Sequence, residues 1–361
     1  MKKKIVVLDC ERMKYANTGL YHYCMQLGMA LQKVMASKEH RLFFYVRKVN
    51  EYIFGNTAWY LIQKGVDKFF MPTNNVALWH CTYQASNYFP FRKKVKVVYT
   101  IHDLNILHET GYSPSQIEKA LSKIQQRIDR ADYVVVISNF TLQDVTKNLQ
   151  LRQTPIKVIY NGCNFDKIEK LQPPQHAIHN NFIFTIGTIN AKKNFHVLPC
   201  LLEGNHKILL IAGITHDENY KQKIIEEAIK YNVQDRVIFL GAINENDKQW
   251  YLQQCEAFVF PSLAEGFGLP VIEAMYFGKP IILSNLTALP EVGGKLAYYF
   301  NNFNAADMQL IYKNALAHYH SHNDLPLKIK EHALQFNWDT TAAQYLQVYN
   351  SLLTPKSIPI V

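Results

Sequence analysis

The stretch that most constrains the fold of this chain runs from residue 257 to residue 284. The apolar run Ala257–Phe260 is typical of a buried strand, and a second such run begins at Ile281. Pro270 stands where the first helical turn is expected, since proline has no N–H group to lose there. Gly278 ends that helix after about two turns. The stretch therefore predicts a strand, a loop, a short helix and a second strand, as in α/β proteins.

The loop before this helix predicts a site for phosphate. Backbone N–H groups near Gly268 and Leu269 lie at the positive end of the helix dipole, where anions bind. Glu265 and Glu273 flank them, and these carboxylates suit the hydroxyl groups of a sugar rather than phosphate. One element thus offers the parts needed for a nucleotide sugar. The alternative is that both glutamates only stabilise the helix dipole, by ~0.3–1 kcal/mol each.

The same stretch carries a family resemblance. Its Glu265-Gly-Phe-Gly-Leu-Pro-Val-Ile-Glu-Ala-Met motif, followed by Gly278–Ile282, closely resembles the retaining glycosyltransferases of family 4. The resemblance implies an α/β protein of GT-B architecture, with two doubly wound Rossmann-like domains that face a central cleft. It also implies that the donor is held in part by Glu265, Gly266, Phe267, Gly268, Leu269 and Glu273.

Other parts of the chain show the alternating pattern that two doubly wound sheets require. Strands are expected at Lys4–Asp9, Leu42–Val46, Val76–His80, Val95–Ile101, Tyr133–Ile137, Ile156–Tyr160, Phe182–Ile186, Ile208–Ala212 and Val237–Leu240. Helices are expected at Leu20–Met35, Pro114–Ala131, Tyr220–Tyr231 and Asp247–Gln254. Another helix is expected to begin near Phe140, and the C-terminal part is expected to be helical to about Leu353. Residues 50–75 are ambiguous.

The composition and the resemblance together divide the chain into four parts. Residues 1–165 are expected to form an N-terminal acceptor-binding Rossmann-like domain, and residues 181–338 a C-terminal nucleotide-sugar-binding one. Residues 166–180 contain two adjacent prolines and no periodicity, so they are the expected linker. Residues 339–361 are expected to form a C-terminal helix that crosses back to the first domain, as in family members.

Two further positions in the first half match the family. The strand Val95–Ile101 ends at His102, and a histidine at the carboxyl end of a strand faces the crevice of an open α/β sheet. The family has a His-Asp pair here, which implies a place for His102 near the donor sugar. The alternatives are a structural pair that caps a turn, or a metal site of His102, Asp103, His108 and Glu109. Gly19 matches a family glycine that touches the donor phosphates.

The loop after Phe182–Ile186 contains the family's cationic position. Family members place there a lysine that binds the donor diphosphate, and Lys193 matches it, with Lys192 where many members have arginine. The alternative for such a pair is a solvated surface. The resemblance further implies that Gly241 and Ala242 lie near the base of the nucleotide.

Composition limits the cellular setting. Hydrophobic residues make up 48% of the 361 residues and charged ones 19%, which is typical of a soluble globular protein, and 361 residues favour two domains. No apolar run is long enough to span a bilayer, and the apolar core after Met1 stops at Asp9, too early for a signal peptide. Six scattered cysteines argue against zinc and against a disulfide framework, and favour the cytoplasm.

The positive charge lies in the first half of the sequence. Residues 1–165 hold 23 Lys+Arg and 11 Asp+Glu, whereas residues 166–361 hold 16 and 18. Nucleic acid is not an expected partner, because no recognised binding module accompanies the charge. An anionic membrane surface is the hypothesis, with a solvated loop as the alternative. The proposed patch consists of Arg92, Lys93, Lys94 and Lys96 beside Tyr88, Phe89 and Phe91.

These observations predict a retaining glycosyltransferase. It would transfer a hexose, mannose-like by resemblance, from a nucleotide-diphosphate sugar to a glycan or lipid-linked glycan acceptor in cell-surface polysaccharide synthesis. The expected catalytic residues are His102, Lys193 and Glu265. The protein is expected in the cytoplasm, attached peripherally to the cytoplasmic face of the membrane. No cofactor and no metal are expected, since Asp-x-Asp does not occur. The alternatives are a nucleotide-sugar epimerase and a non-catalytic nucleotide-sugar-binding protein of the same fold.

Overall fold

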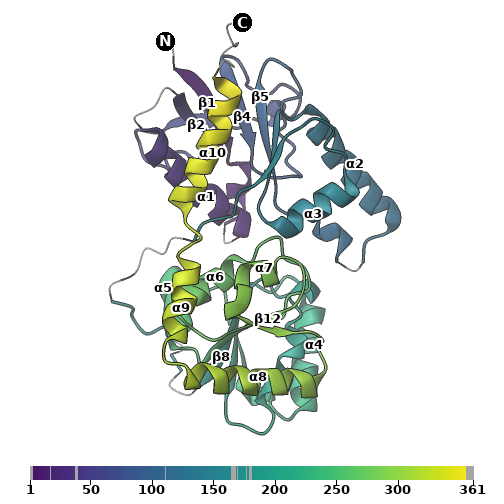
Figure 1. Ribbon diagram of the computed structural model, residues 1–361, viewed down its shortest axis with the longest axis vertical. Coiled ribbons are helices and arrows are strands. Elements are labelled where there is room, and N and C mark those ends of the chain that lie inside the picture. The colour runs from purple at the N-terminus through teal and green to yellow at the C-terminus, as the bar shows by residue number, and fades with distance from the viewer. Residues whose placement is uncertain are drawn as a thin grey trace, which may run out of the picture. The chain divides into compact units, whose positions relative to one another are not determined.

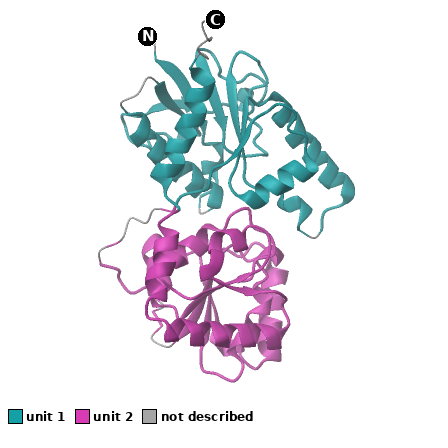
Figure 2. Cartoon of the chain, viewed as in Figure 1, with its two compact units in different colours: residues 1–162, 336–361 teal, residues 163–335 magenta. Residues whose placement is uncertain are grey.

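The computed structural model describes residues 3–16, 18–36, 40–109, 111–163, 168, 170–175, 177–178 and 181–354. The chain forms two compact units (Figure 2). Unit 1 comprises residues 1–162 and 336–361, and unit 2 comprises residues 163–335. The chain therefore leaves unit 1 once and returns to it. No helix in the described ranges is long and apolar enough to cross a membrane.

Unit 1 is built on a seven-stranded sheet in the order β3-β2-β1-β4-β5-β6-β7, with every neighbouring pair parallel. Its strands are β1 (Lys4–Asp9), β2 (His40–Val46), β3 (Trp59–Ile62), β4 (Val76–Cys81), β5 (Lys96–Ile101), β6 (Tyr133–Val136) and β7 (Ile156–Val158). Its helices are α1 (Gly19–Met35), α2 (Pro114–Arg130), α3 (Asn139–Asn148) and α10 (Trp338–Leu353).

Helices cover both faces of this sheet (Figure 1). Val6 and Leu8 of β1 belong to one hydrophobic cluster with residues of α1 and α10. Val7 belongs to a second cluster, with residues of α2 and α3. Neighbouring side chains of a strand point to opposite faces, and both faces of a parallel sheet are buried. That is why these strands are near-continuous apolar runs in the sequence.

Unit 2 repeats the arrangement with a six-stranded parallel sheet in the order β10-β9-β8-β11-β12-β13. Its strands are β8 (Phe182–Ile186), β9 (Ile208–Ala212), β10 (Val237–Gly241), β11 (Ala257–Phe260), β12 (Ile281–Ser284) and β13 (Tyr298–Phe300). Its helices are α4 (Glu218–Lys230), α5 (Glu245–Gln254), α6 (Leu269–Tyr276), α7 (Leu289–Gly293), α8 (Ala305–Ser321) and α9 (Leu325–Ala333).

In both sheets the strand order reverses beside the first strand of the unit, between β1 and β4 and between β8 and β11. Ligands of open α/β sheets bind outside the carboxyl ends of the strands at such a reversal. The predicted fold of two doubly wound α/β units is confirmed. Two strands were not predicted. β3 lies in the ambiguous stretch 50–75 and is only partly buried, and β13, three residues long, lies in the C-terminal part that was expected to be helical.

The return to unit 1 is fixed by close backbone packing. A Cβ atom on Gly162 would lie 2.2 Å from the backbone nitrogen of Trp338, so only glycine fits where the two crossing segments meet. Thr341 donates a hydrogen bond from its hydroxyl group to the carbonyl oxygen of Tyr160, at 2.7 Å. Beyond this point α10 packs along α1 (Figure 1), and Tyr345 and Tyr349 are fully buried.

Candidate active site

Glycine residues close the carboxyl ends of β8, β9 and β10. The backbone N–H of Gly213 donates to the carbonyl oxygen of Gly241 at 2.7 Å. A Cβ atom on Gly213, whose φ is 136°, would lie 1.9 Å from the carbonyl oxygen of Gly187. The three strand ends therefore approach more closely than side chains allow. Sequence reasoning missed Gly213, although a glycine directly after the apolar run of β9 was the available signal. Gly241 and Ala242 are exposed.

Lys193 lies over this edge. It ends a 3₁₀ turn, Ala191–Lys193, whose N-cap residue Asn190 accepts a hydrogen bond from the Lys193 backbone N–H at 3.3 Å. A Cβ atom on Gly187 would lie 3.0 Å from Cε of Lys193, so the lysine side chain passes directly across that glycine. Its Nζ atom lies 4.8 Å from the ring centroid of Phe260 and 2.5 Å from Oε1 of Glu265.

The ion pair between Lys193 and Glu265 joins two loops that are distant in sequence. The hydroxyl group of Ser262 donates to Oε1 of Glu265 at 2.6 Å, and both members of the ion pair have side chains only 14% exposed. Burial alone would raise the pKa of Glu265, but the charges of Lys193 and Lys192 and the two hydrogen bonds lower it. The carboxylate is therefore held ionised at neutral pH.

The loop between β11 and α6 keeps the start of the helix open. Gly268 is the N-cap residue at a φ of 107°, in the left-handed region, and a Cβ atom there would lie 2.9 Å from Cδ2 of Leu289. Having no side chain, Gly268 cannot cap the first N–H groups of the helix. Gly266 and Phe267 are buried, and Leu269 is half-buried. The anion site stays a prediction, and at this helix start it would consist of backbone N–H groups rather than side chains.

Glu273 is also paired with a lysine. Nζ of Lys248 in α5 lies 2.8 Å from Oε1 of Glu273 and 2.9 Å from Oε2 of Glu245. Burial lowers the pKa of Lys248, but the two carboxylates outweigh burial and raise it. Sequence reasoning missed Lys248. Lys248 stands three residues after Glu245 in α5, and this spacing predicts the contact between them. The contact with Glu273 depends on how α5 packs on α6.

In unit 1, His102 follows β5 at the carboxyl edge of the sheet. It is only 7% exposed, and its ring meets that of Tyr23 edge to face, with centroids 4.5 Å apart. Its Nε2 lies 2.8 Å from the carbonyl oxygen of Thr82, so Nε2 carries the proton and Nδ1 is the acceptor of the neutral ring. Burial outweighs this hydrogen bond and lowers the pKa of His102 to about 4.

The neighbours of His102 do not form a metal centre. Nε2 of His108 lies 2.6 Å from Oδ2 of Asp144, and Oδ1 of Asp103 accepts from the backbone N–H of Asn105 at 3.1 Å. Within the described ranges, no group of three or more His, Cys, Asp or Glu side chains could hold a metal ion. The alternative interpretation of this segment as a metal site therefore has no support in the fold.

Gly19 is the first residue of α1 and is exposed. The hydroxyl group of Thr18 caps the helix by accepting from the Tyr21 backbone N–H at 3.3 Å. No atom would lie within 4 Å of a Cβ atom on Gly19, so packing does not require glycine there. Its expected contact with donor phosphates stays a prediction.

The proposed membrane patch needs a correction. Tyr88 and Phe89 are buried at 6% and 5% exposure, in the cluster that contains Tyr45 and Tyr99, so their rings fill the core and are not available to lipid. Phe91 is exposed, as are the basic residues that follow it, and Lys96 pairs with Asp132 at 2.7 Å. The sequence could not distinguish an aromatic loop that closes a core from one that faces solvent.

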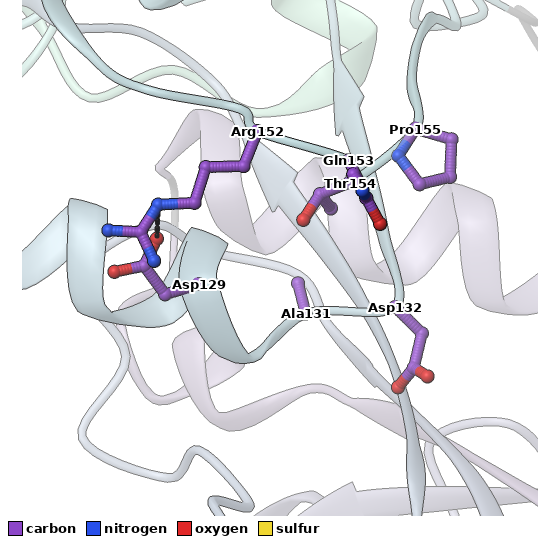
Figure 3. A pocket seen from close by; sticks show the side chains of 7 residues that line it. All are labelled: Asp129, Ala131, Asp132, Arg152, Gln153, Thr154 and Pro155. Atoms are coloured by element: carbon purple, nitrogen blue, oxygen red, sulfur yellow. Dashed lines mark ion pairs between the residues drawn. The ribbon is translucent and has the colours of Figure 1, made fainter.

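A shallow groove lies elsewhere in unit 1 (Figure 3). It is lined by Asp129, Ala131, Asp132, Arg152, Gln153, Thr154 and Pro155. Arg152 points toward Asp129, with 3.7 Å between Nε and Oδ1. These residues precede β6 and β7, so the groove lies at the amino edge of the sheet, opposite His102, and contains none of the predicted site residues.

Comparison with known proteins matches residues 35–314 of the chain in two consecutive parts. Residues 35–167 match the family model described as Glycosyltransferase Family 4, and residues 166–314 match Glycosyl transferases group 1. The serotype-specific mannosyltransferase WbdA of Escherichia coli is 28% identical over 277 residues, which are 72% of this chain and 34% of that protein. The chain therefore spans about a third of the length of that relative.

Two solved structures share the fold. Sucrose-phosphate synthase of Thermosynechococcus elongatus superposes with a TM-score of 0.75 at 20% identity, covering 97% of this chain and 99% of that one. Anabaena HepE, solved in complex with UDP-glucose, gives a TM-score of 0.74 at 16% identity, covering 96% and 99%. At such identities these similarities concern the architecture alone.

Proposed function

This chain belongs to the glycosyltransferases of group 1 and family 4, and we propose that it transfers a hexose from a nucleotide-diphosphate sugar to a glycan or a lipid-linked glycan. The observation that carries the proposal is the partly buried Lys193–Glu265 pair at the carboxyl edge of the unit 2 sheet. A cation and an ionised carboxylate held side by side match the two chemical parts of such a donor, its diphosphate and its sugar hydroxyl groups.

Lys193 would stabilise the leaving group. When the bond between the sugar C1 and the diphosphate oxygen breaks, negative charge grows on the phosphate, and a preorganised ammonium group stabilises it most in the transition state. Lys193 and the open N-terminus of α6 would supply that stabilisation, and Lys192 adds a second charge nearby. We propose that no metal ion is needed, because these groups neutralise the diphosphate.

The carboxylates address the hydroxyl groups. Glu265 would accept hydrogen bonds from the donor sugar and Glu273 from the ribose, while Gly241 and Ala242 leave room for the base. Each carboxylate is held in place by an ion pair with a lysine. Donor phosphate would draw Lys193 toward itself and release an oxygen of Glu265 for the sugar. The ion pair thus acts as a preformed frame for the donor.

The proposed reaction retains the configuration at C1. The acceptor hydroxyl group attacks C1 on the face from which the nucleotide diphosphate leaves, and its proton passes to the leaving phosphate oxygen. His102 would take part as a neutral ring, with Nδ1 accepting a hydrogen bond from a sugar hydroxyl group, since Nε2 is held by Thr82. The mannose-like donor is supported by the name of the relative WbdA, and UDP-hexoses by the complex of HepE.

The proposed setting is the cytoplasm, with unit 1 in reversible contact with an anionic leaflet that carries a lipid-linked acceptor. The positive charge of residues 1–165 supports this contact, since each Lys or Arg near such a surface contributes ~1 kcal/mol. Arg92, Lys93 and Lys94 are exposed and add to this positive charge.

The test is a thermal-shift screen of GDP, UDP, dTDP and ADP, followed by the matching sugar nucleotides. A bound donor raises the free energy of unfolding by ~2.7 kcal/mol at a concentration about a hundred times its Kd. Donor consumption with a polyisoprenyl-linked glycan, and NMR of the product anomer, then identify the reaction. Retained configuration supports the proposal. Binding without turnover favours the non-catalytic alternative, interconversion of free sugar nucleotides favours an epimerase, and no binding at all overturns the proposal.

A further inference from the structure

The most exposed aromatic side chains of unit 1 lie in one short turn after β3. Phe69 and Phe70 are 83% and 72% exposed, and Val66 is 60% exposed. They belong to the segment from Lys64 to Phe70, here called the 64–70 turn, whose centre is the 3₁₀ helix Gly65–Lys68. Single exposed apolar residues need no explanation, but three in one turn form a patch that is expected to have a partner.

The fold holds this turn in shape. The backbone N–H groups of Phe69 and Phe70 both donate to the carbonyl oxygen of Val66, at 3.0 and 2.9 Å. Asp67 is buried and accepts from the Lys64 backbone N–H at 2.7 Å and from the Tyr45 hydroxyl group at 2.9 Å. The phenylalanine rings therefore face outward because the turn is anchored from the inside by its one acidic residue.

Charge identifies the kind of partner. Residues 52–102 contain six Lys or Arg residues and a single acid, Asp67, which the fold turns inward. Lys64 and Lys68 of the turn are exposed, as is Arg47, and the backbone N–H of Gln63 joins this region to β2 by donating to Val46 at 2.8 Å. Exposed rings between cations, with no exposed acid, are complementary to an apolar layer behind anionic groups.

The position in the sheet also matters. The turn follows the carboxyl end of β3, the outermost strand, and His102 follows the carboxyl end of β5 on the same edge. Four strand spacings separate them, roughly 20 Å. The basic cluster Arg92–Lys94 precedes β5 and so lies at the opposite, amino edge. An acceptor that projects from a bilayer under the 64–70 turn would lie on the side of the sheet where His102 is.

We propose that the 64–70 turn inserts Phe69 and Phe70 into the headgroup boundary of an anionic lipid bilayer, with Lys64 and Lys68 paired to lipid phosphates. The proposal rests on the proposed function only for its purpose, which is to bring the protein to a lipid-linked acceptor. One apolar contact with supporting cations gives reversible attachment, since stable anchoring needs two strong signals.

The test compares three variants in co-sedimentation with phosphatidylcholine vesicles, with and without phosphatidylglycerol. F69S/F70S should lower partitioning to the mixed vesicles by about tenfold or more, because the apolar contribution is lost. K64Q/K68Q should weaken binding at low salt and flatten its salt dependence. The matched control is L310S/L327S, which changes side chains of unit 2 that are 57% and 60% exposed and should leave partitioning unchanged.

Insertion has its own readout. In F70W, the added indole should be quenched by bromine-labelled lipids in mixed vesicles, beyond the quenching of the wild-type tryptophans. Wild-type partitioning by F69S/F70S, or no extra quenching in F70W, overturns the proposal. It is equally overturned if the wild type is a dimer in light scattering and F69S/F70S is a monomer, since the patch would then bind a second copy.

The same samples separate this proposal from the proposed function. Nucleotide affinity in calorimetry should be equal for the wild type and F69S/F70S, since the turn lies in unit 1 and the expected donor residues Lys193 and Glu273 lie in unit 2. Vesicle binding without nucleotide binding leaves the membrane proposal standing and removes the transferase. Nucleotide binding without vesicle binding removes the membrane proposal and leaves the transferase proposal standing.

Discussion

The two sheets have the same strand order, yet the predicted site residues after their strands meet the cost of burial in different ways. In unit 1, burial lowers the pKa of His102 to about 4 and of His80 to about 3, and raises the pKa of Asp9 to about 7. The buried histidines are therefore neutral at physiological pH. In unit 2, partly buried charges are held as the pairs Lys193–Glu265 and Lys248–Glu273.

This difference indicates which ligand each edge suits. A charge that is buried without a partner is costly, so a site meets that cost by neutralising the group or by pairing it. A neutral histidine favours neutral hydroxyl groups, whereas paired charges can be redirected to a charged ligand at little further desolvation cost. We infer that unit 2 holds the nucleotide diphosphate and, through Glu265 and Glu273, hydroxyl groups of the donor, whereas the neutral His102 of unit 1 suits uncharged groups only.

The largest expected effect is that of K193A. It should lower kcat by about a hundredfold, because the developing phosphate charge loses its preorganised cation. The matched control is K207A, which breaks a similar half-buried ion pair with Glu256, 2.6 Å long, at the amino edge of the same sheet. Steady-state kinetics should show near-normal kcat for K207A. Equal losses in both variants would mean that the carboxyl edge is not distinctive, and a change of KM alone would make Lys193 a binding residue only.

The next effect sharpens the role of the second pair. E273Q should weaken nucleotide binding by about ten- to a hundredfold, since charge-assisted hydrogen bonds contribute ~1.5–3 kcal/mol. Isothermal titration calorimetry measures it. E245Q is the control, because Glu245 contacts the same lysine but is 51% exposed, and it should change the affinity little. If both variants bind the nucleotide as the wild type does, Glu273 serves only to hold Lys248.

A smaller effect concerns unit 1. The pKa of His102 is about 4 in the folded protein and 6.5 in the unfolded chain. Between these pH values the unfolded chain therefore binds more protons than the folded protein. Its contribution to stability is complete above pH 6.5 and is lost as pH falls toward 4, by at most ~3 kcal/mol. Asp9, with its raised pKa, acts in the opposite sense over much of this range.

Because Asp9 also titrates in this range, the measurement compares the wild type with a variant that lacks only His102. Urea unfolding from pH 7.5 to pH 4 gives the free energy of unfolding of the wild type and of H102Q. The difference between the two values should become smaller as the solution becomes more acidic. A constant difference would mean that His102 is not neutralised by burial, and that unit 1 does not differ from unit 2 in the proposed way.

The smallest expected effect is that of metal removal. EDTA should leave turnover unchanged, since Lys193 and the start of α6 are proposed to neutralise the diphosphate. Restoration of an EDTA-abolished rate by Mn²⁺ would contradict this. The carboxylates of unit 2 would then have to be reconsidered as metal ligands brought together by the donor.

How much of this could be predicted from sequence depends on the range of the interactions. The strand, loop and helix at 257–276 follow from local pattern, and Lys193 and Glu265 were each found through motif resemblance. Their contact was not predicted, because it requires β8 and β11 to be neighbours, which only the reversal of strand order provides. Lys248 was missed for the same reason, since its contact with Glu273 arises from helix packing.

Unit 1 shows where local pattern fails. The strand Trp59–Ile62 lies at the edge of the sheet, so Trp59 is exposed and the other three residues are only partly buried, and the strand shows no alternation of burial. Tyr88 and Phe89 stand close to a basic run and resemble a surface patch, but they close a core under the loop before β5. The exposure of Phe69 and Phe70 depends on Asp67 being anchored by Tyr45, a contact between separate strand regions.

The return of the chain at Phe336 has a consequence for how the protein is made. Residues 163–335 are all present before α10 leaves the ribosome, so unit 2 can fold first although it is encoded second. Until then the cluster around Val6 and Leu8 lacks Tyr345 and Leu346, and His80 lacks the Tyr349 hydroxyl group, 2.7 Å away in the finished fold. Limited proteolysis of a purified fragment ending at residue 335 should find unit 2 protected and unit 1 cleaved.

At ~5–20 residues per second, translation of unit 2 takes on the order of ten to forty seconds. Throughout that interval the nascent first half exposes the apolar groove that α10 will later fill. The window for chaperone capture or misassembly during synthesis therefore falls on the N-terminal half, and its length is set by the size of unit 2.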